Sequence, residues 1–464
     1  MGELIPVASF LYFCITIVII SLNIYKKKYI ELLNPVVFYS ILWSIPFAVI
    51  PLLIYFKFFD QLNILNKEFK DSDILISQIM AILSLISLYL GFQLGNKIIF
   101  FKKKLAFFSK NWSNFSVLFI FSLYFFLILL FVKNGIETGS IFRGVNELKE
   151  DIKSGGLNYF LSIFYISNGS IFYMAFLPLI SLISFSYFNK KLYLILAIIS
   201  SSFLISIGIY SSQKELIASV LLVILFYLYY LRKSITFKRE IIVFIFVVMF
   251  LFSFPYFNLY REYLKVTAEK PDITKGITFT IENYNIDKIL QNLNYLFLRF
   301  DHLNTNLFII TSDKDFKFGY TYLSGLFSFL AGLPKMPKEG FPLIDIRFNN
   351  TFAREYGIIN ESNYDTYVTL PSFTEIYMNF GLLAIPFFMF LIGIIYKKIY
   401  NLLIEKNPNA NLLGFILWYI VIFQGSALSF SSIMFQFGRM ALPLIMILII
   451  LNGAIFLKIE HEYK

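Results

Sequence analysis

A carboxylate stands where a long hydrophilic stretch joins an apolar run. Glu375 follows Pro371 and lies at the beginning of the apolar run 373–396, with Tyr377 close behind it. In the first turn of a helix a carboxylate can simply favour the helix dipole, by about 0.3 to 1 kcal/mol. An ionisable side chain at the edge of a membrane is also a functional candidate by default, and proton transfer is the chemistry that a carboxylate offers. Both interpretations of Glu375 stay open.

A second titratable side chain lies on a segment with helical periodicity. Between residues 287 and 310, apolar residues recur at spacings of about three and four, which predicts an amphipathic helix lying on the membrane or on other helices. The opposite face of this helix gathers Tyr295, Arg299, His302 and Asn306. That face is expected either to be solvated or to point toward an anionic head group.

Basic residues follow in a stretch that cannot be helical throughout. Three prolines within 332–342 force an extended, kinked path that presents Lys335 and Lys338. Lysines held outside a membrane suggest an anionic partner, although the same segment can serve as a plain connector. Arg347 and Arg354 come next along the chain.

Three further cations are expected at the same membrane surface. Lys214 lies in a short link between two apolar runs, Arg261 follows another run, and Arg439 lies near the outer end of the last one. Each of them alone is typical of an interfacial anchor. As a set they fit a pocket for a lipid-linked phosphate or diphosphate, because Arg offers bidentate contacts and Lys offers a point charge.

The elements that must position these residues are membrane helices. With 58% hydrophobic and 15% charged residues, the chain is too apolar for a water-soluble protein of ordinary composition. Its apolar runs reach the roughly 20 residues that cross a bilayer, where every backbone amide must be satisfied internally. The expected fold class is therefore an all-α polytopic membrane protein. The first run, 4–24, is followed by lysines and is expected to be a retained helix rather than a signal peptide.

Hydrophobic length predicts about eleven transmembrane helices. We expect an N-terminal bundle of about eight helices over 1–259, a large loop with an amphipathic helix over 260–372, and about three C-terminal helices over 373–464. The run 159–187 is overlong and contains Pro178, so it is expected to be tilted, kinked or partly interfacial. The predicted spans lie near 4–24, 36–56, 74–94, 115–132, 159–187, 192–209, 216–231, 241–259, 373–396, 412–430 and 433–457.

The short loops predict the orientation of these helices. Lys and Arg concentrate in alternate loops, which the positive-inside rule assigns to the cytoplasm. The N-terminus is then outside, the C-terminus is inside, and the loop 260–372 is extracytoplasmic. The basic loops are 26–28, 97–110, 190–191, 232–239, 397–406 and the C-terminal tail.

Several other kinds of site lack their motifs. Gly-rich phosphate loops, CxxC pairs, HExxH and GxSxG are absent from the sequence. Only two histidines, His302 and His461, and one cysteine, Cys14, are present, which argues against a zinc site and a Ser-His-Asp hydrolase. We therefore expect no metal and no cofactor. The net charge of +11 is scattered between spans, so it indicates topology rather than binding to nucleic acid.

At these loop residues the chain resembles the bacterial oligosaccharide repeat-unit polymerases of the Wzy family, which assemble O-antigen and capsular polysaccharide. The stretch 333–342 looks like the family's pattern of Pro-basic-x-x-Pro-x-Lys. The stretch 371–381, which ends in Glu-x-Tyr-x-Asn-Phe-Gly, looks like the family's exit from the loop into the next helix. The layout, with many helices and one large outer loop late in the chain, extends the resemblance to the whole chain. Lys335 stands where Arg is usual and Lys338 comes one residue early, so their individual roles stay open.

The resemblance implies a glycosyltransferase of the all-helical, lipid-donor class in the bacterial cytoplasmic membrane. The donor would be an oligosaccharide linked to undecaprenyl diphosphate, and the acceptor would be the terminal hydroxyl of a second lipid-linked repeat unit. Cations can stabilise the leaving diphosphate without a metal, and a carboxylate or imidazole can take the acceptor proton. A flippase and a chain-length regulator would work beside such an enzyme. The residues expected in these roles are Arg261, Arg299, Arg347 and Arg354 for the diphosphate, Glu375 or His302 for the base, and Lys214, Lys335, Lys338, Tyr377 and Arg439 for further substrate contacts.

Other functions remain open from the residues alone. An O-antigen ligase shares the class and layout and differs in its acceptor. A lipid-linked oligosaccharide flippase, or another transporter, would be expected to carry charges within its spans and short loops on both faces. In this chain the predicted spans are almost free of charge and one loop dominates. A non-catalytic scaffold or sensor is a further alternative.

Overall fold

The computed structural model describes the long apolar segments more fully than the loops between them. Helices and turns make up the described residues, and no strand occurs among them. The expected all-α fold is thus confirmed for this part of the chain. The described residues are 2–27, 31–56, 69–97, 112–137, 168–210, 214–231, 256, 259–260, 262–263, 273–284, 302–312, 314–323, 325–326, 348–358, 360, 370–424 and 430–452.

The chain divides into two compact units, each assembled from segments that are far apart in the sequence. The predicted division by membrane topology, at residues 259 and 372, stays a prediction. The first unit comprises Met1–Leu105, Leu296–Glu405 and Leu413–Leu442, and the second comprises Ala106–Tyr295, Lys406–Leu412 and Pro443–Lys464.

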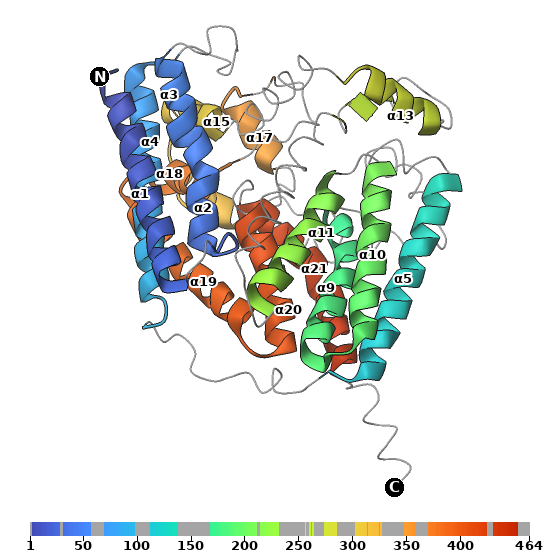
Figure 1. Cartoon of the computed structure of the whole chain (residues 1–464). Helices are drawn as coiled ribbons and strands as arrows, with labels where there is room; N and C mark the ends of the chain where they lie inside the picture. Colours follow the sequence, from blue (N-terminus) through green and yellow to red (C-terminus); the bar gives the residue numbers. More distant parts are fainter. Residues whose placement is uncertain are drawn as a thin grey trace. The chain divides into compact units, whose positions relative to one another are not determined.

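The first unit combines long helices with short ones, two of which come from the region of the predicted outer loop (Figure 1). Its long helices are α1 (Leu4–Lys27), α4 (Asp71–Leu94), α19 (Ala384–Ile404) and the continuous run of α2 (Pro35–Ser44), the π-helical turn η1 (Ile45–Val49) and α3 (Ile50–Tyr55). Its short helices are α15 (His302–Ile310), α17 (Phe348–Glu355), α18 (Ser372–Phe380) and the π-helical turn η5 (Trp418–Gln424). Two further helices, α20 (Pro408–Leu417) and α21 (Phe430–Leu451), each contribute residues to both units.

The second unit is a separate group of apolar helices. Polar side chains tie some of its segments together: Asn409 accepts a hydrogen bond from Trp112 Nε1 at 2.7 Å and donates one to Asn452 Oδ1 at 2.8 Å. In the same way the Tyr193 hydroxyl donates to Asn114 Oδ1 at 2.8 Å. The helices of this unit are α5 (Asn114–Glu137), α9 (Asn168–Phe188), α10 (Lys191–Tyr210), α11 (Lys214–Phe226), the π-helical turn η4 (Tyr227–Leu231) and α13 (Ile273–Glu282).

Several of these helices have the length and composition of membrane spans. Among the described residues, five helical stretches are long and apolar enough to cross a membrane: Leu4–Lys27, Pro35–Tyr55, Asp71–Leu94, Lys191–Ile209 and Ala384–Ile404. Shorter apolar helices cover Asn114–Leu130, Ala175–Phe188, Leu216–Leu231 and Pro408–Phe423. The predicted count of about eleven spans stays a prediction, and most of the predicted span 241–259 lies outside the described residues.

The predicted span 373–396 is wrong in its continuity. The helix α18 ends at Phe380, and α19 begins at Ala384. Between them Gly381 adopts φ 79° and ψ −177°, a conformation that is essentially restricted to glycine. The run is apolar on both sides of this break, so hydropathy alone does not reveal it. As a consequence, Glu375 lies on a short helix of its own, outside the candidate span α19.

The two helices α4 and α19 approach each other closely at two glycines. A Cβ atom at Gly91 would lie 2.0 Å from the carbonyl oxygen of Phe390, and a Cβ atom at Gly393 would lie 2.2 Å from that of Leu88. No side chain can fit at either position without moving the backbone of the other helix. Small residues allow this kind of close packing in membranes, where van der Waals contact replaces the hydrophobic effect as a driving force between helices.

We predict that Gly393→Leu destabilises the folded protein by at least about 3 kcal/mol, the upper end of ordinary overpacking, because the new side chain meets backbone rather than a movable side chain. The matched control is Ile395→Phe, which adds volume on the same helix at a side chain that is 51% exposed. Thermal unfolding of the two purified variants in detergent measures the difference. Equal melting temperatures would contradict the close contact between α4 and α19.

Candidate functional site

A chain of buried hydrogen bonds joins three helices of the first unit. The Thr374 hydroxyl of α18 donates to Asn306 Oδ1 of α15 at 3.1 Å, and Asn306 Nδ2 donates to Ser77 Oγ of α4 at 2.6 Å. All three side chains are buried. Because buried polar groups are costly without partners, this series of hydrogen bonds favours one register between the three helices. It also fixes the residue before Glu375.

Glu375 is a buried carboxylate with one oxygen held by the backbone. Its side chain is 2% exposed, and Oε2 accepts the amide of Phe430 at 2.8 Å, at the beginning of α21. The other oxygen, Oε1, accepts no hydrogen bond from the described residues. Burial raises the pKa of Glu375 to about 7, against a lowering by the Phe430 amide and the nearby Thr321 hydroxyl. Near neutral pH this carboxylate can therefore both give and take a proton.

Asn379 holds the stretch 317–322 against α18. Its Nδ2 donates to Thr321 Oγ1 at 2.7 Å and to the carbonyl of Glu375 at 2.8 Å, and its Oδ1 accepts the amide of Gly319 at 3.0 Å. The amide of Phe318 also donates to the Asn379 carbonyl at 3.0 Å. All the polar atoms of the Asn379 side chain are thus used to bring Thr321 next to Glu375.

Tyr322 closes the same site with aromatic packing. Its ring is stacked on the rings of Phe380 and Phe388, with centroids 6.0 and 6.3 Å away, and meets Phe430 edge-on at 5.3 Å. Burial and the charge of Glu375 raise the pKa of Tyr322, so its hydroxyl stays protonated. Glu375 is therefore surrounded by an amide, a threonine hydroxyl and a tyrosine, in a setting with little water.

His302 lies in an aromatic cluster rather than at a polar surface. Its side chain is 3% exposed, and its ring centroid lies 4.6 Å from that of Trp43. Trp43 also contacts Phe373 of α18 at 5.8 Å, so α15 and α18 pack on the same cluster. Burial lowers the pKa of His302 to about 3, which leaves it neutral near pH 7.

The predicted polar face of the segment 287–310 is wrong where the structure describes it. His302 and Asn306 are both buried, neither solvated nor open to a head group, because α15 packs against α4 on one side and α18 on another. Asn306 gains two hydrogen bonds there, which offset the loss of contact with water. Tyr295 and Arg299 lie outside the described residues.

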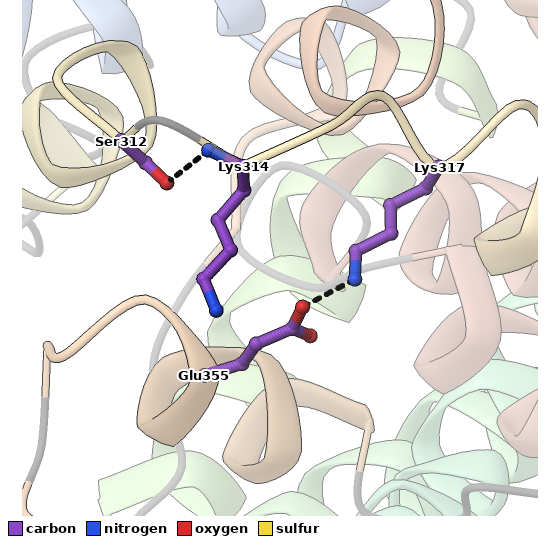
Figure 2. A network of polar contacts seen from close by, with 4 residues as sticks. All are labelled: Ser312, Lys314, Lys317 and Glu355. Carbon is purple, nitrogen blue, oxygen red and sulfur yellow. Dashed lines mark hydrogen bonds and ion pairs between the residues drawn. The ribbon is translucent and has the colours of Figure 1, made fainter.

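A charged pair joins the stretch that Asn379 holds to a neighbouring helix. Lys317 forms an ion pair with Glu355, at the end of α17 (Figure 2). The side chains of Lys314 and Lys317 both extend toward Glu355, and the Lys314 amide donates to Ser312 Oγ at 3.1 Å. The half-buried Arg354 precedes Glu355 on the same helix. The Lys317 ammonium is therefore already paired with a carboxylate, and no contact between these basic side chains and Glu375 is seen among the described residues.

The structure places only some of the other predicted site residues. Tyr377 is half-buried on α18, with its ring 6.3 Å from that of Phe316. Lys214 begins α11 in the second unit and Arg439 lies on α21 in the first, and of their side chains the structure describes nothing. The predicted residues that lie outside the described residues are Arg261, Arg299, Lys335, Lys338 and Arg347.

Three residues of the site were not predicted. Asn379 stood inside the loop-exit pattern and could have been chosen from it, since a buried amide there needs partners. Thr321 and Tyr322 carry no signal in the sequence, because only the folding of 317–322 onto α18 brings them to Glu375.

Among the described residues, no group of three or more His, Cys, Asp or Glu side chains could hold a metal ion.

The raised pKa of Glu375 predicts how stability depends on pH. The pKa of Glu375 in the folded state, about 7, lies above the ordinary value of 4.5 for a glutamate, so the folded state binds the proton more tightly. The tighter proton binding adds about 3 kcal/mol at most to the free energy of unfolding. This stabilisation is fully present below about pH 4.5 and is lost as the pH rises through about 7. We therefore predict that the difference in melting temperature, wild type minus Glu375→Gln, decreases as the pH is raised from about 5 to about 8.

The control for this comparison is Glu282→Gln, which changes an exposed carboxylate on α13. Its melting curve should follow wild type at every pH. Parallel pH profiles for wild type and Glu375→Gln would show that Glu375 titrates alike in the folded and unfolded states.

Comparisons with models of protein families, with curated proteins and with solved structures give no match for this chain. The function proposed below therefore rests on the residues and on the geometry of the site.

Proposed function

We propose that the protein is a polymerase that joins oligosaccharide repeat units, carried on undecaprenyl diphosphate, into a surface polysaccharide. The product would be O-antigen or capsule, and the reaction would take place on the outer face of the bacterial cytoplasmic membrane. The observation that carries this proposal is Glu375, a buried carboxylate with a pKa of about 7 and an uncommitted Oε1, next to a candidate span. The resemblance of the loop stretches 333–342 and 371–381 to Wzy polymerases supplies the substrate class.

The proposed step is a substitution at the anomeric carbon of the donor sugar. The acceptor hydroxyl gives its proton to Glu375 Oε1, and its oxygen forms a bond to the anomeric carbon. The bond between that carbon and the diphosphate oxygen breaks, and undecaprenyl diphosphate leaves with the electron pair. Cations near the leaving group stabilise the charge that develops on it. Arg261, Arg299, Arg347 and Arg354 are proposed for this role, with Lys214, Lys335, Lys338, Tyr377 and Arg439 as further substrate contacts.

The geometry favours Glu375 over His302 as the base. The Phe430 amide holds Oε2, whereas Oε1 is buried and accepts no hydrogen bond from the described residues, so Oε1 is the oxygen proposed to take the proton. A base is most effective when its pKa lies near the working pH, which describes Glu375 at about 7. His302, with a pKa of about 3, is a much weaker base and packs edge-on to Trp43. We therefore assign His302 to the packing of α15 and not to proton transfer.

We predict that Glu375→Gln lowers polymer formation about 10²- to 10⁴-fold while leaving the amount of protein in the membrane unchanged, because the amide keeps the size of the side chain but cannot accept a proton. The measurement is the length distribution of the surface glycan on a gel, from cells with matched protein levels. His302→Ala and Glu282→Gln serve as comparisons. A normal ladder for Glu375→Gln would remove Glu375 from the reaction, and a collapsed ladder for His302→Ala at normal protein level would return the base to His302.

Deletion of the gene separates the proposed activity from its alternatives. A polymerase deletion should leave lipid-linked single repeat units on the outer leaflet and no long polymer. Long polymer that stays on its lipid carrier would indicate a ligase, which transfers finished chains. Repeat units trapped on the cytoplasmic leaflet would indicate a flippase.

A further inference from the structure

The stretch 314–326 lies within the loop predicted to be hydrophilic, yet it presents large apolar side chains. Phe318 is 79% exposed, Phe316 is 46% exposed and Leu323 is 46% exposed. Tyr320 and Leu326 are exposed by 43% and 56%. A contiguous group of this kind is unusual for a segment surrounded by water, where exposed apolar residues are normally scattered.

This stretch packs closely against the break between α18 and α19, and a glycine in each segment makes the close contact possible. Gly319 has φ 86°, and a Cβ atom there would lie 3.3 Å from the ring of Phe380. Gly381 has φ 79°, and a Cβ atom there would lie 3.1 Å from the ring of Phe316. Each glycine thus faces an aromatic ring of the other segment. The amides of residues 317 and 318 donate to the carbonyls of Met378 and Asn379, both at 3.0 Å, and complete the junction.

The exposed apolar surface continues from this junction onto a candidate membrane span. Leu383, which immediately precedes α19, is 92% exposed. Phe387 and Ile395 on α19 are 62% and 51% exposed, as expected for side chains that face lipid. The stretch 314–326 is therefore continuous with the lipid-facing side of α19, at the end of the span where membrane proteins place aromatic residues. Lys314, at the border of the stretch, matches the basic residues that anchor interfacial segments.

We infer that residues 316–323 and 325–326, together with 380–383, insert into the outer interface of the lipid bilayer, and we name them the interfacial segment. Its partner is the membrane itself, at the depth of the head groups and the first carbons of the acyl chains. The site, formed by Thr321 and Tyr322 of the segment and by Glu375 beside it, then lies at the level of the lipid phosphates. On the proposed function, the lipid-linked donor would reach Glu375 sideways from the bilayer and not through the aqueous loop.

The test relies on the chain having a single cysteine, Cys14, which one substitution removes so that labelling cysteines can be introduced elsewhere. In a Cys14→Ser background, single cysteines at Phe318, Tyr320 and Phe387 are labelled with an environment-sensitive fluorophore in the full-length protein. The protein is then reconstituted in phosphatidylcholine vesicles. Phe387, an exposed residue within the candidate span α19, serves as the reference for membrane contact, and Asn360→Cys, at an exposed polar residue after α17, serves as the control for water contact. Each label is quenched separately by phosphatidylcholine brominated on its acyl chains and by iodide in the buffer.

The labels at Phe318 and Tyr320 are expected to behave as the label at Phe387 does, with brominated lipid quenching them several-fold more than it quenches the label at Asn360. Iodide should quench the Asn360 label several-fold more than the other three. Strong quenching by iodide at both Phe318 and Tyr320, with no effect of brominated lipid, would overturn the inference. Two label positions guard against a local distortion at either one. The measurement needs no catalysis, so its outcome is independent of the polymerase proposal.

Discussion

The close approach of α4 and α19 at Gly91 and Gly393 is the constraint on which the rest of the first unit depends. Membrane helices gain little from the hydrophobic effect once they are in lipid, so their association relies on close contact and on hydrogen bonds. With these two backbones in contact, α19 fixes the junction at Gly381 and hence the position of α18. The helix α4 supplies Ser77, which receives the hydrogen bond from Asn306 and so sets the position of α15. The helices α18 and α15, whose positions follow from α19 and α4, form the framework of the candidate site.

Burial makes the Glu375 carboxylate unfavourable to ionise and brings its pKa close to neutrality. A carboxylate removed from water is expensive to ionise, which raises its pKa toward neutrality. One backbone amide, from Phe430, stabilises the charged form enough to keep both protonation states accessible. Asn379 adds no charge, but it aligns Gly319 and Thr321 with the end of α18. A carboxylate with these properties, beside the candidate span α19, is consistent with the reaction that we propose between two lipid-linked substrates.

The sequence predicts the long elements of the fold well, because length and apolar composition are the dominant signals in a membrane. The predicted spans 4–24, 36–56 and 74–94 agree with α1, α2 to α3 and α4 within a few residues. The break at Gly381 escaped prediction, since hydropathy is high on both sides of it and only the backbone angles of one glycine reveal it. The face of His302 was also wrong, because periodicity shows that a helix has a polar side but not whether other helices cover it. For the same reason Glu375 could be chosen from its place between loop and helix, whereas Thr321 and Tyr322 depend on a long-range contact that no local pattern encodes.

Single-turnover glycosyl transfer by the purified protein in vesicles tests most directly whether Glu375 takes the proton of the acceptor hydroxyl, as we propose. Lipid-linked repeat units are supplied as both donor and acceptor, and the rate of dimer formation is followed against pH. For wild type the rate should rise with pH and level off above about 7, the pKa of Glu375. In Glu375→Gln the remaining rate should be low and lack that rise. An equal rate for the two proteins, or the same rise with pH in both, would contradict the claim.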